Sequence, residues 1–156
     1  MTRHAWRLIK RRYSGAAFDG EGARLNGARW NSVGTRVAYA SDSKALAVLE
    51  VLVHLQSTGT LSAYDLVGVE IPDALIEVLD RASLPRAWTE SPPPVEIQAI
   101  GDTWIAANRS AVLAVPSVVV PDAVNYLINP LHPGFAEMTV YPPEPYALDS
   151  RLMRGI

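Results

Sequence analysis

The 156-residue chain contains no cysteine. A disulfide framework, a thiol nucleophile and a cysteine-ligated zinc site are therefore all excluded. The three histidines, His4, His54 and His132, do not have the HExxH-type spacing of a zinc site, so we expect neither a bound metal nor a prosthetic group. A chain without disulfides suits the reducing cytoplasm, which is where we expect this protein to act.

Long apolar runs are also missing from the sequence. No stretch approaches the roughly 20 apolar residues that a membrane-spanning helix needs, and the basic N-terminal segment is not followed by the apolar run and cleavage site of a signal peptide. We therefore expect a soluble protein with no membrane partner. Because 49% of the residues are hydrophobic, a packed core is well supplied, and a single domain over residues 1–156 is expected.

The chain also lacks a strong excess of positive charge. Its formal net charge is −2, whereas a general nucleic-acid binder usually carries a clear basic excess. Five basic residues do concentrate near the start of the chain: Arg3, Arg7, Lys10, Arg11 and Arg12. A solvated basic edge is the more ordinary interpretation of this cluster, and contact with the phosphates of a small ligand or of RNA is the alternative.

The pattern of apolar residues predicts an α+β domain with a mixed sheet and a few helices. Strands are expected at residues 5–9, 36–40, 64–71, 111–115, 117–120, 126–128 and 138–141. The strongest helix prediction covers residues 44–56, because Ser41-Asp42-Ser43 offers N-capping side chains and no Gly or Pro follows before Gly59. A second helix is expected at residues 98–109, after an extended proline-rich segment. The segment 13–34 contains five glycines and is expected to be a loop.

Within that segment, the sequence Gly27-Ala28-Arg29-Trp30-Asn31 has the composition of a nucleotide-binding loop. Arginine offers a planar fork of donors for a pyrophosphate, tryptophan offers a stacking surface, and glycine lets the backbone approach an anion closely. A surface loop whose tryptophan is anchored in the core would have the same composition. The two interpretations of this loop stay open at this point.

Glu50 is unusual because it lies in an otherwise apolar stretch, where an unpaired buried carboxylate would be costly. On a helix it shares one stripe with Ala47, His54 and Ser57. Periodicity alone favours a stripe that faces solvent. If the stripe instead lines a cleft, Glu50 can accept a hydrogen bond from a ribose hydroxyl and stabilise an oxocarbenium-like charge.

Three further residues have both a functional and a purely structural interpretation. Tyr39, at the end of an expected strand, is either a ligand-facing aromatic or a half-buried sheet tyrosine. Ser117 has no GxSxG motif around it, which favours a hydrogen-bonding role over a nucleophilic one. His132 lies in the turn-rich loop 129–134, whose Asn, Pro and Gly residues are already explained by turn formation.

Taken in order, these motifs resemble those of the RES-domain family, which is named after arginine, glutamate and serine. The matching segments are Trp6-Arg7, GARWN at 27–31, VAYAS at 37–41, Glu50, VPS at 115–117 and NPLHP at 129–133. The resemblance extends from Arg7 to about Val140, and an ordered series of short motifs is much more specific than any one of them.

The resemblance implies a fold similar to ADP-ribosyltransferases of the diphtheria-toxin kind, with a mixed, mainly antiparallel sheet. RES proteins are toxins encoded beside an Xre-type antitoxin, and they destroy NAD by phosphorolysis or hydrolysis, some members being ADP-ribosyltransferases for a protein target. For this chain it therefore implies NAD as substrate, inorganic phosphate as a co-substrate, and an Xre-like antitoxin as partner. It also implies a toxin dimer inside a larger complex that contacts DNA only through the antitoxin.

The resemblance also implies roles for individual residues. The catalytic group is Glu50, Arg29 and Tyr39, in which Glu50 serves the ribose and the transition-state charge. The NAD-binding set is Arg7, Arg29, Asn31, Tyr39, Ser117 and His132. Trp30 is expected to be structural. The sequence does not decide which arginine is the family's namesake, or whether water, phosphate or a protein side chain accepts the ADP-ribosyl group.

Two other classes of function compete with NAD cleavage. A nucleotide-binding module without turnover would need every binding residue but less from Glu50. A ribonuclease would use the N-terminal basic cluster, but the sequence shows neither a histidine pair nor a base-stacking strand pattern. We therefore expect an NAD-degrading enzyme.

Overall fold

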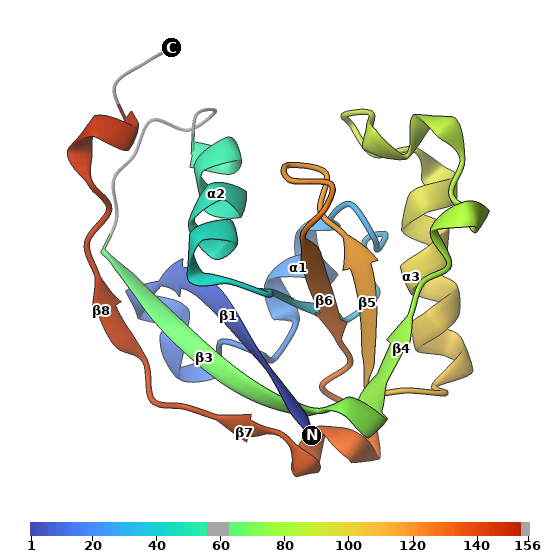
Figure 1. The fold of residues 1–156 in the computed structure, drawn as a ribbon, viewed down its shortest axis with the longest axis horizontal. Coiled ribbons are helices and arrows are strands. Elements are labelled where there is room, and N and C mark those ends of the chain that lie inside the picture. The colour runs from blue at the N-terminus through green and yellow to red at the C-terminus, as the bar shows by residue number, and fades with distance from the viewer. Residues whose placement is uncertain (56–62, 154–156) are drawn as a thin grey trace.

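A computed structural model describes residues 1–55 and 63–153, and its described strands form one sheet (Figure 1). The order is β4-β5-β6-β2-β1-β3-β7, and β8 also pairs with β3. The strands are β1 (Thr2–Lys10), β2 (Ala38–Ser41), β3 (Tyr64–Pro72), β4 (Ile76–Val78), β5 (Val112–Pro116), β6 (Val124–Ile128), β7 (Thr139–Val140) and β8 (Glu144–Tyr146). Only the β4–β5 pair is parallel among them. The predicted α+β class with a mixed, mainly antiparallel sheet is confirmed.

The helices connect these strands. The α-helices are α1 (Glu21–Asn26), α2 (Lys44–Leu55) and α3 (Val95–Ala107). Short 3-10 helices are η1 (Arg11–Ala16), η2 (Asp73–Leu75), η3 (Arg81–Ser83), η4 (Arg86–Thr89), η5 (Pro133–Glu137) and η6 (Ser150–Met153). The capping predicted for α2 is present, because Ser43 Oγ accepts a hydrogen bond from the Leu46 amide at 3.0 Å. The helix predicted at 44–56 is confirmed as far as Leu55, and residue 56 lies outside the described residues.

Three predictions of secondary structure were wrong in detail. The segment 13–34 is not all loop, since it contains α1 and most of η1. Residues 117–120 form a turn and not a strand, because the Ser117 hydroxyl accepts hydrogen bonds from the amides of Val119 and Val120. Helix α3 starts at Val95, three residues before the predicted start, because Pro94 can directly precede the first turn of a helix.

The sheet curls around a core on one face and carries α2 and α3 on the other. Small side chains such as Ala5, Ala38 and Ala114 on the inner face pack with Val67, Val69 and Phe18. On the outer face, α2 packs on the β1–β3 half and α3 packs on the β2–β6–β5 half (Figure 1). A single register pair, Trp6 with Ser41, joins β1 to β2, so the two halves of the sheet separate beyond this point.

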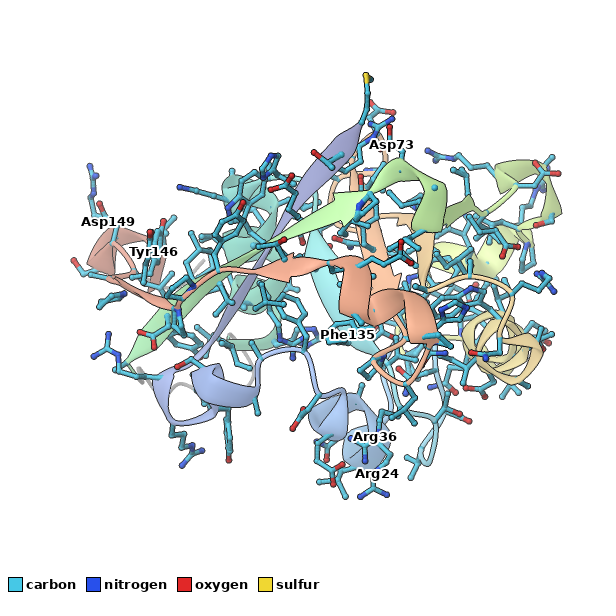
Figure 2. The ribbon with its side chains drawn as sticks, turned by 90° about the horizontal axis from the view of Figure 1, so that it is seen from below. Arg24, Arg36, Asp73, Phe135, Tyr146 and Asp149 are labelled. Atoms are coloured by element: carbon cyan, nitrogen blue, oxygen red, sulfur yellow. The ribbon has the colours of Figure 1, made fainter. Side chains whose placement is uncertain are left out.

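The C-terminal segment follows the outer edge of β3. Strands β7 and β8 pair with successive parts of β3 (Figure 1), and Tyr146 and Leu148 pack against the cluster beneath α2. Figure 2 shows Tyr146 beside Asp149 at this corner of the molecule. The segment therefore covers an edge strand that would otherwise present unpaired backbone groups. No described helix is both long enough and apolar enough to cross a membrane.

The short helix α1 is tied to the chain after it through one carboxylate. Glu21 accepts hydrogen bonds from Arg24 Nε at 2.9 Å and from Arg36 NH2 at 2.8 Å, and Figure 2 shows the two arginines close together. The hydrogen bond from Arg24 is the largest of the effects that lower the pKa of Glu21, which falls to about 2. Glu21 thus links α1 to the segment that enters β2.

This link should be lost in acid. Because folding lowers the pKa of Glu21 from 4.5 to about 2, its contribution to stability is complete above pH 4.5 and disappears as the pH falls toward 2. We expect Glu21→Gln to lower the melting temperature at pH 7, and this difference from wild type should shrink at pH 3. Calorimetry of both proteins at pH 7, 4.5 and 3 measures it, with the exposed Glu96→Gln as the matched control. A difference that is constant with pH would contradict the prediction.

Candidate active site

The Glu50 carboxylate is held against the sheet and does not point freely into solvent. Its Oε1 accepts hydrogen bonds from Ser117 Oγ at 2.7 Å and from Asn125 Nδ2 at 2.8 Å. Its Oε2 accepts no hydrogen bond from the described residues. Of the stripe predicted around it, Ala47 is buried, His54 is exposed, and residue 57 lies outside the described residues. The half-buried Glu50 therefore combines a fixed orientation with one oxygen available to a ligand.

Ser117 positions this carboxylate. The residue has no solvent exposure, and its hydroxyl accepts hydrogen bonds from the Val119 and Val120 amides at 3.1 Å each. The single hydroxyl proton is donated to Glu50. Ser117 therefore has no donor left for a substrate in this arrangement, and the structure places it behind Glu50.

Asn125 is a member of the site that the sequence interpretation missed. It lies in β6 opposite Ser41 of β2, and its Oδ1 accepts a hydrogen bond from Ser41 Oγ at 2.8 Å. Its Nδ2 is then directed at Glu50. The sequence does give one signal, because Asn125 is a polar residue inside a β-rich segment, but its partner depends on strand register.

Arg29 brings positive charge to the same region. Burial lowers the pKa of the Arg29 guanidinium, and the nearby negative charge of Glu50 opposes this effect. The group still carries its charge at neutral pH. Its NH1 donates to the backbone oxygens of Trp88 at 3.1 Å and Glu90 at 2.7 Å. Its Nε and NH2 form no hydrogen bond with the described residues, so a planar pair of donors faces away from this anchor.

Arg7 is half-buried beside Tyr39 and is not part of a solvated basic edge. Its NH1 donates to the Tyr39 backbone oxygen at 2.9 Å, whereas its Nε is buried without a hydrogen-bond partner in the described structure. Burial lowers the pKa of Arg7, and the charge of Asp19 acts in the opposite direction. Since an unpaired buried donor is costly, Arg7 is incompletely satisfied in this arrangement.

The side chain of Tyr39 is fixed by Asn31. The phenol donates to Asn31 Oδ1 at 2.6 Å, and burial raises the pKa of Tyr39 well above its usual value. The Asn31 amide nitrogen donates to the backbone oxygens of Ala23, Ser32 and Thr35. Asn31 is fully buried, so the structure gives it an internal role and leaves its side chain no free group for NAD.

The loop that carries Arg29 rests on one side of α3. Gln98 Nε2 donates to the Ala28 backbone oxygen at 3.0 Å, and Asp102 accepts a hydrogen bond from the Ser32 amide at 3.0 Å. Between these two contacts, Trp30 is 2% exposed and packs with Trp104 and its neighbours. The structure therefore supports the anchoring interpretation of Trp30.

His132 is not brought to the other candidate residues. Its Nδ1 accepts a hydrogen bond from the Gly134 amide at 2.9 Å and so caps η5. Asn125 lies near the start of β6, whereas His132 follows the far end of that strand. Phe135, labelled in Figure 2, marks the position of η5. The structure thus places Glu50, Ser117 and Arg29 together, links Arg7, Tyr39 and Asn31, and leaves His132 apart.

Strand β2 and the loop before it connect the group around Glu50 with the group around Tyr39. Tyr39 and Ser41 alternate with buried Ala40, so they project from the same face of β2. Arg29 and Asn31 are two residues apart in the loop fixed on α3. The site thus consists of one fixed carboxylate, one guanidinium group and one tyrosine, and Arg7 is joined to it only through the Tyr39 backbone oxygen.

The comparison that decides the family is a match of residues 4–149 to a family model described as the RES domain. The chain belongs to the RES-domain family. This is the toxin family that its ordered motifs resemble, so that prediction is confirmed. The RES chain is 38% identical to the "Prs ADP-ribosylating toxin" of Sphingobium sp. (strain YBL2) over 159 residues, covering 99% of each protein. It is also 38% identical to "Toxin Res" of Yersinia enterocolitica over 148 residues, covering 94% of the chain and 97% of that relative.

A solved structure shares the fold of this RES protein. It is the Mycobacterium tuberculosis MbcT–MbcA toxin–antitoxin complex, matched with a TM-score of 0.75 and 20% identity over 99% of this chain and 88% of that chain. At 20% sequence identity, this comparison shows that the two proteins share a fold. The curled, mainly antiparallel sheet with a few helices is therefore also found in a solved toxin–antitoxin complex.

Proposed function

We propose that this RES protein is the toxin of a toxin–antitoxin pair and that it cleaves the bond between nicotinamide N1 and ribose C1′ of NAD. The observation that carries the proposal is the Glu50 carboxylate, fixed by Ser117 and Asn125 with Oε2 left available. A negative charge that is already in position before the reaction stabilises an oxocarbenium-like ribose in the transition state. A module that only binds nucleotides would need less from this group, because accepting a hydrogen bond from a ribose hydroxyl would suffice.

The proposed reaction is dissociative. The C1′–N1 bond breaks, its electron pair stays on the nicotinamide nitrogen, and nicotinamide leaves as a neutral molecule. The positive charge that develops on C1′ and the ring oxygen is stabilised by Glu50. Water then yields ADP-ribose and a proton, whereas inorganic phosphate yields ADP-ribose 1″-phosphate. Glu50 has no need to transfer a proton before nicotinamide departs.

The arginines and Tyr39 supply binding groups for the rest of the substrate. Nε and NH2 of Arg29 form a planar donor pair suited to the NAD pyrophosphate. Arg7 would supply a second cation, which is held beside the Tyr39 backbone oxygen. Tyr39 would pack beside the nicotinamide ribose, since its phenol is kept neutral and in place by Asn31.

Protein ADP-ribosylation is a second candidate function. The name of the Sphingobium relative, "Prs ADP-ribosylating toxin", favours it, and that relative is 38% identical over 99% of this chain. Transfer from NAD to a protein breaks the same C1′–N1 bond, so the role of Glu50 is unchanged. The two functions differ only in the nucleophile that attacks C1′.

The partner that we propose is an Xre-like antitoxin which neutralises the toxin in the cytoplasm. Support comes from the solved neighbour, which is a toxin–antitoxin complex. A toxin dimer within a larger complex is part of the same proposal. Expression of the chain alone would then stop bacterial growth, and co-expression of the antitoxin would restore it.

The deciding experiment incubates the purified chain with NAD and follows nicotinamide release. Three reactions run in parallel: buffer alone, buffer with inorganic phosphate, and buffer with bacterial lysate and labelled NAD. Release in buffer indicates hydrolysis, stimulation by phosphate indicates phosphorolysis, and release with label on a protein indicates ADP-ribosyl transfer. If no reaction releases nicotinamide while the chain remains folded, the proposed function is wrong.

A further inference from the structure

We propose that Asn125 is a positioning residue that holds the Glu50 carboxylate in its reactive orientation, and that Ser41 fixes the orientation of the Asn125 amide. The proposal rests on the proposed function, because it assigns Asn125 a role in that reaction. Its observations are two hydrogen bonds of 2.8 Å, from Asn125 Nδ2 to Glu50 Oε1 and from Ser41 Oγ to Asn125 Oδ1.

The chemistry of the three side chains permits only one direction of donation for these two hydrogen bonds. An ionised carboxylate only accepts hydrogen bonds, so the amide must present its NH2 group to Glu50. The amide oxygen then faces Ser41, whose hydroxyl donates to it. Ser41 is buried, with 4% of its surface exposed, and it therefore orients the amide without direct competition from bulk water.

Two hydrogen bonds connect the strand of Asn125 to the segment that leads into the helix of Glu50. The Val124 amide donates to Asp42 Oδ2 at 3.0 Å, and the Asp42 amide donates to the Val124 backbone oxygen at 3.0 Å. Asp42 lies between β2 and α2, two residues before the helix starts. The strand that carries the Asn125 amide and the segment that leads to Glu50 are thus hydrogen-bonded to each other.

Ser117 and Asn125 donate to the same carboxylate oxygen, from two different strand ends. This arrangement restricts the carboxylate and leaves Oε2 without a hydrogen bond from the described residues. Removing one donor frees rotation of the group, and small displacements of a reacting group cost up to about 10²-fold in rate. We therefore assign Asn125 an effect on kcat and little effect on KM.

The test compares Asn125→Ala with Asn125→Asp in the NAD-cleavage assay. Asn125→Ala should lower kcat by roughly 10- to 100-fold with KM within about threefold. Asn125→Asp keeps the shape and the acceptor for Ser41 but sets a second carboxylate against Glu50. Its kcat at pH 8 should therefore be at least as low as that of Asn125→Ala. If Asn125 only filled space, the Asp variant would stay near wild type.

The pH profile gives a readout that packing does not affect. As the pH falls, the two adjacent carboxyl groups of Asn125→Asp take up one proton between them and can form a hydrogen bond again, so its rate relative to wild type should rise. The ratio for Asn125→Ala should stay flat. Arg29 interacts with Glu50 and Asp42 is bonded to the Val124 amide. Asp122 and His54 are three and four residues along the chain from Asn125 and Glu50 respectively, and the Ala variant retains all four groups.

The matched control is Asn129→Asp, which puts the same charge on a buried amide at the other end of β6. It should show no rise in relative rate at low pH. Crystal structures of Asn125→Asp at pH 8 provide an arm independent of activity, in which the Glu50 carboxylate should leave its position beside Ser117. An unmoved Glu50, or unchanged kcat in both Asn125 variants, would overturn the assignment. If the wild-type protein does not turn over NAD, the proposed function is wrong. The position of Glu50 in the crystal structures then still tests whether Asn125 orients it.

Discussion

Replacing Glu50 by glutamine should lower kcat for nicotinamide release by about 10²- to 10³-fold, the range found when one preorganised electrostatic contact to a transition state is removed. The loss should fall on kcat, because the proposed binding of NAD relies on the arginines and not on Glu50. Steady-state kinetics with a nicotinamide assay over a range of NAD concentrations measures both constants.

The glutamine variant separates charge from shape. Its amide oxygen can still accept hydrogen bonds from Ser117 and Asn125, so its melting temperature should stay close to that of wild type. The exposed Glu96→Gln on α3 removes the same charge away from the site and should leave kcat unchanged. Nicotinamide release by Glu50→Gln at the wild-type rate would rule out the electrostatic role of Glu50 while leaving NAD cleavage itself intact.

The sequence was sufficient for the parts of the fold that depend on local patterns. Helix α2 and strand β3 follow directly from capping residues, alternation and the proline at the end of the strand. The ordered motifs also single out Glu50 without any information about its hydrogen-bond partners. Periodicity alone favoured a solvated glutamate, because it cannot reveal the turn at Ser117 that faces this side of the helix.

The remaining parts depend on contacts between distant segments. Asn125 meets Glu50 only because β6 pairs with β2 in a register that sets Asn125 opposite Ser41, and register cannot be read from one strand alone. At Val118-Val119-Val120, strand propensity gave the wrong structure because the Ser117 hydroxyl binds the amides that a neighbouring strand would need. His132 lies in one of the segments that resemble the family, but the structure places it at the other end of the sheet.

Gly101 shows most clearly what the sequence could not reveal. Nothing distinguishes this glycine within the predicted helix, where it only lowers helix propensity. In the structure, α3 and the Arg29 loop approach so closely that a Cβ at position 101 would overlap the backbone oxygen of Trp30. Gln98 and Asp102 hold the loop on either side of this contact. The absent side chain is therefore what allows Arg29 to be presented from a rigid support.

Gly101→Ala should consequently destabilise the protein by at least about 1–3 kcal/mol, the cost of forcing one extra methyl group into a closely packed site. The gain in helix propensity from glycine to alanine, about 1 kcal/mol, acts in the opposite direction and is outweighed because a backbone atom cannot move aside as a side chain can. Urea denaturation measures the loss, with Thr103→Ala on the exposed side of α3 as the control, which should be neutral or slightly stabilising. Because the loop must shift to admit the methyl group, any folded Gly101→Ala protein should also bind NAD more weakly. An unfolding midpoint equal to that of wild type would show that the loop rests on α3 less tightly than the structure has it.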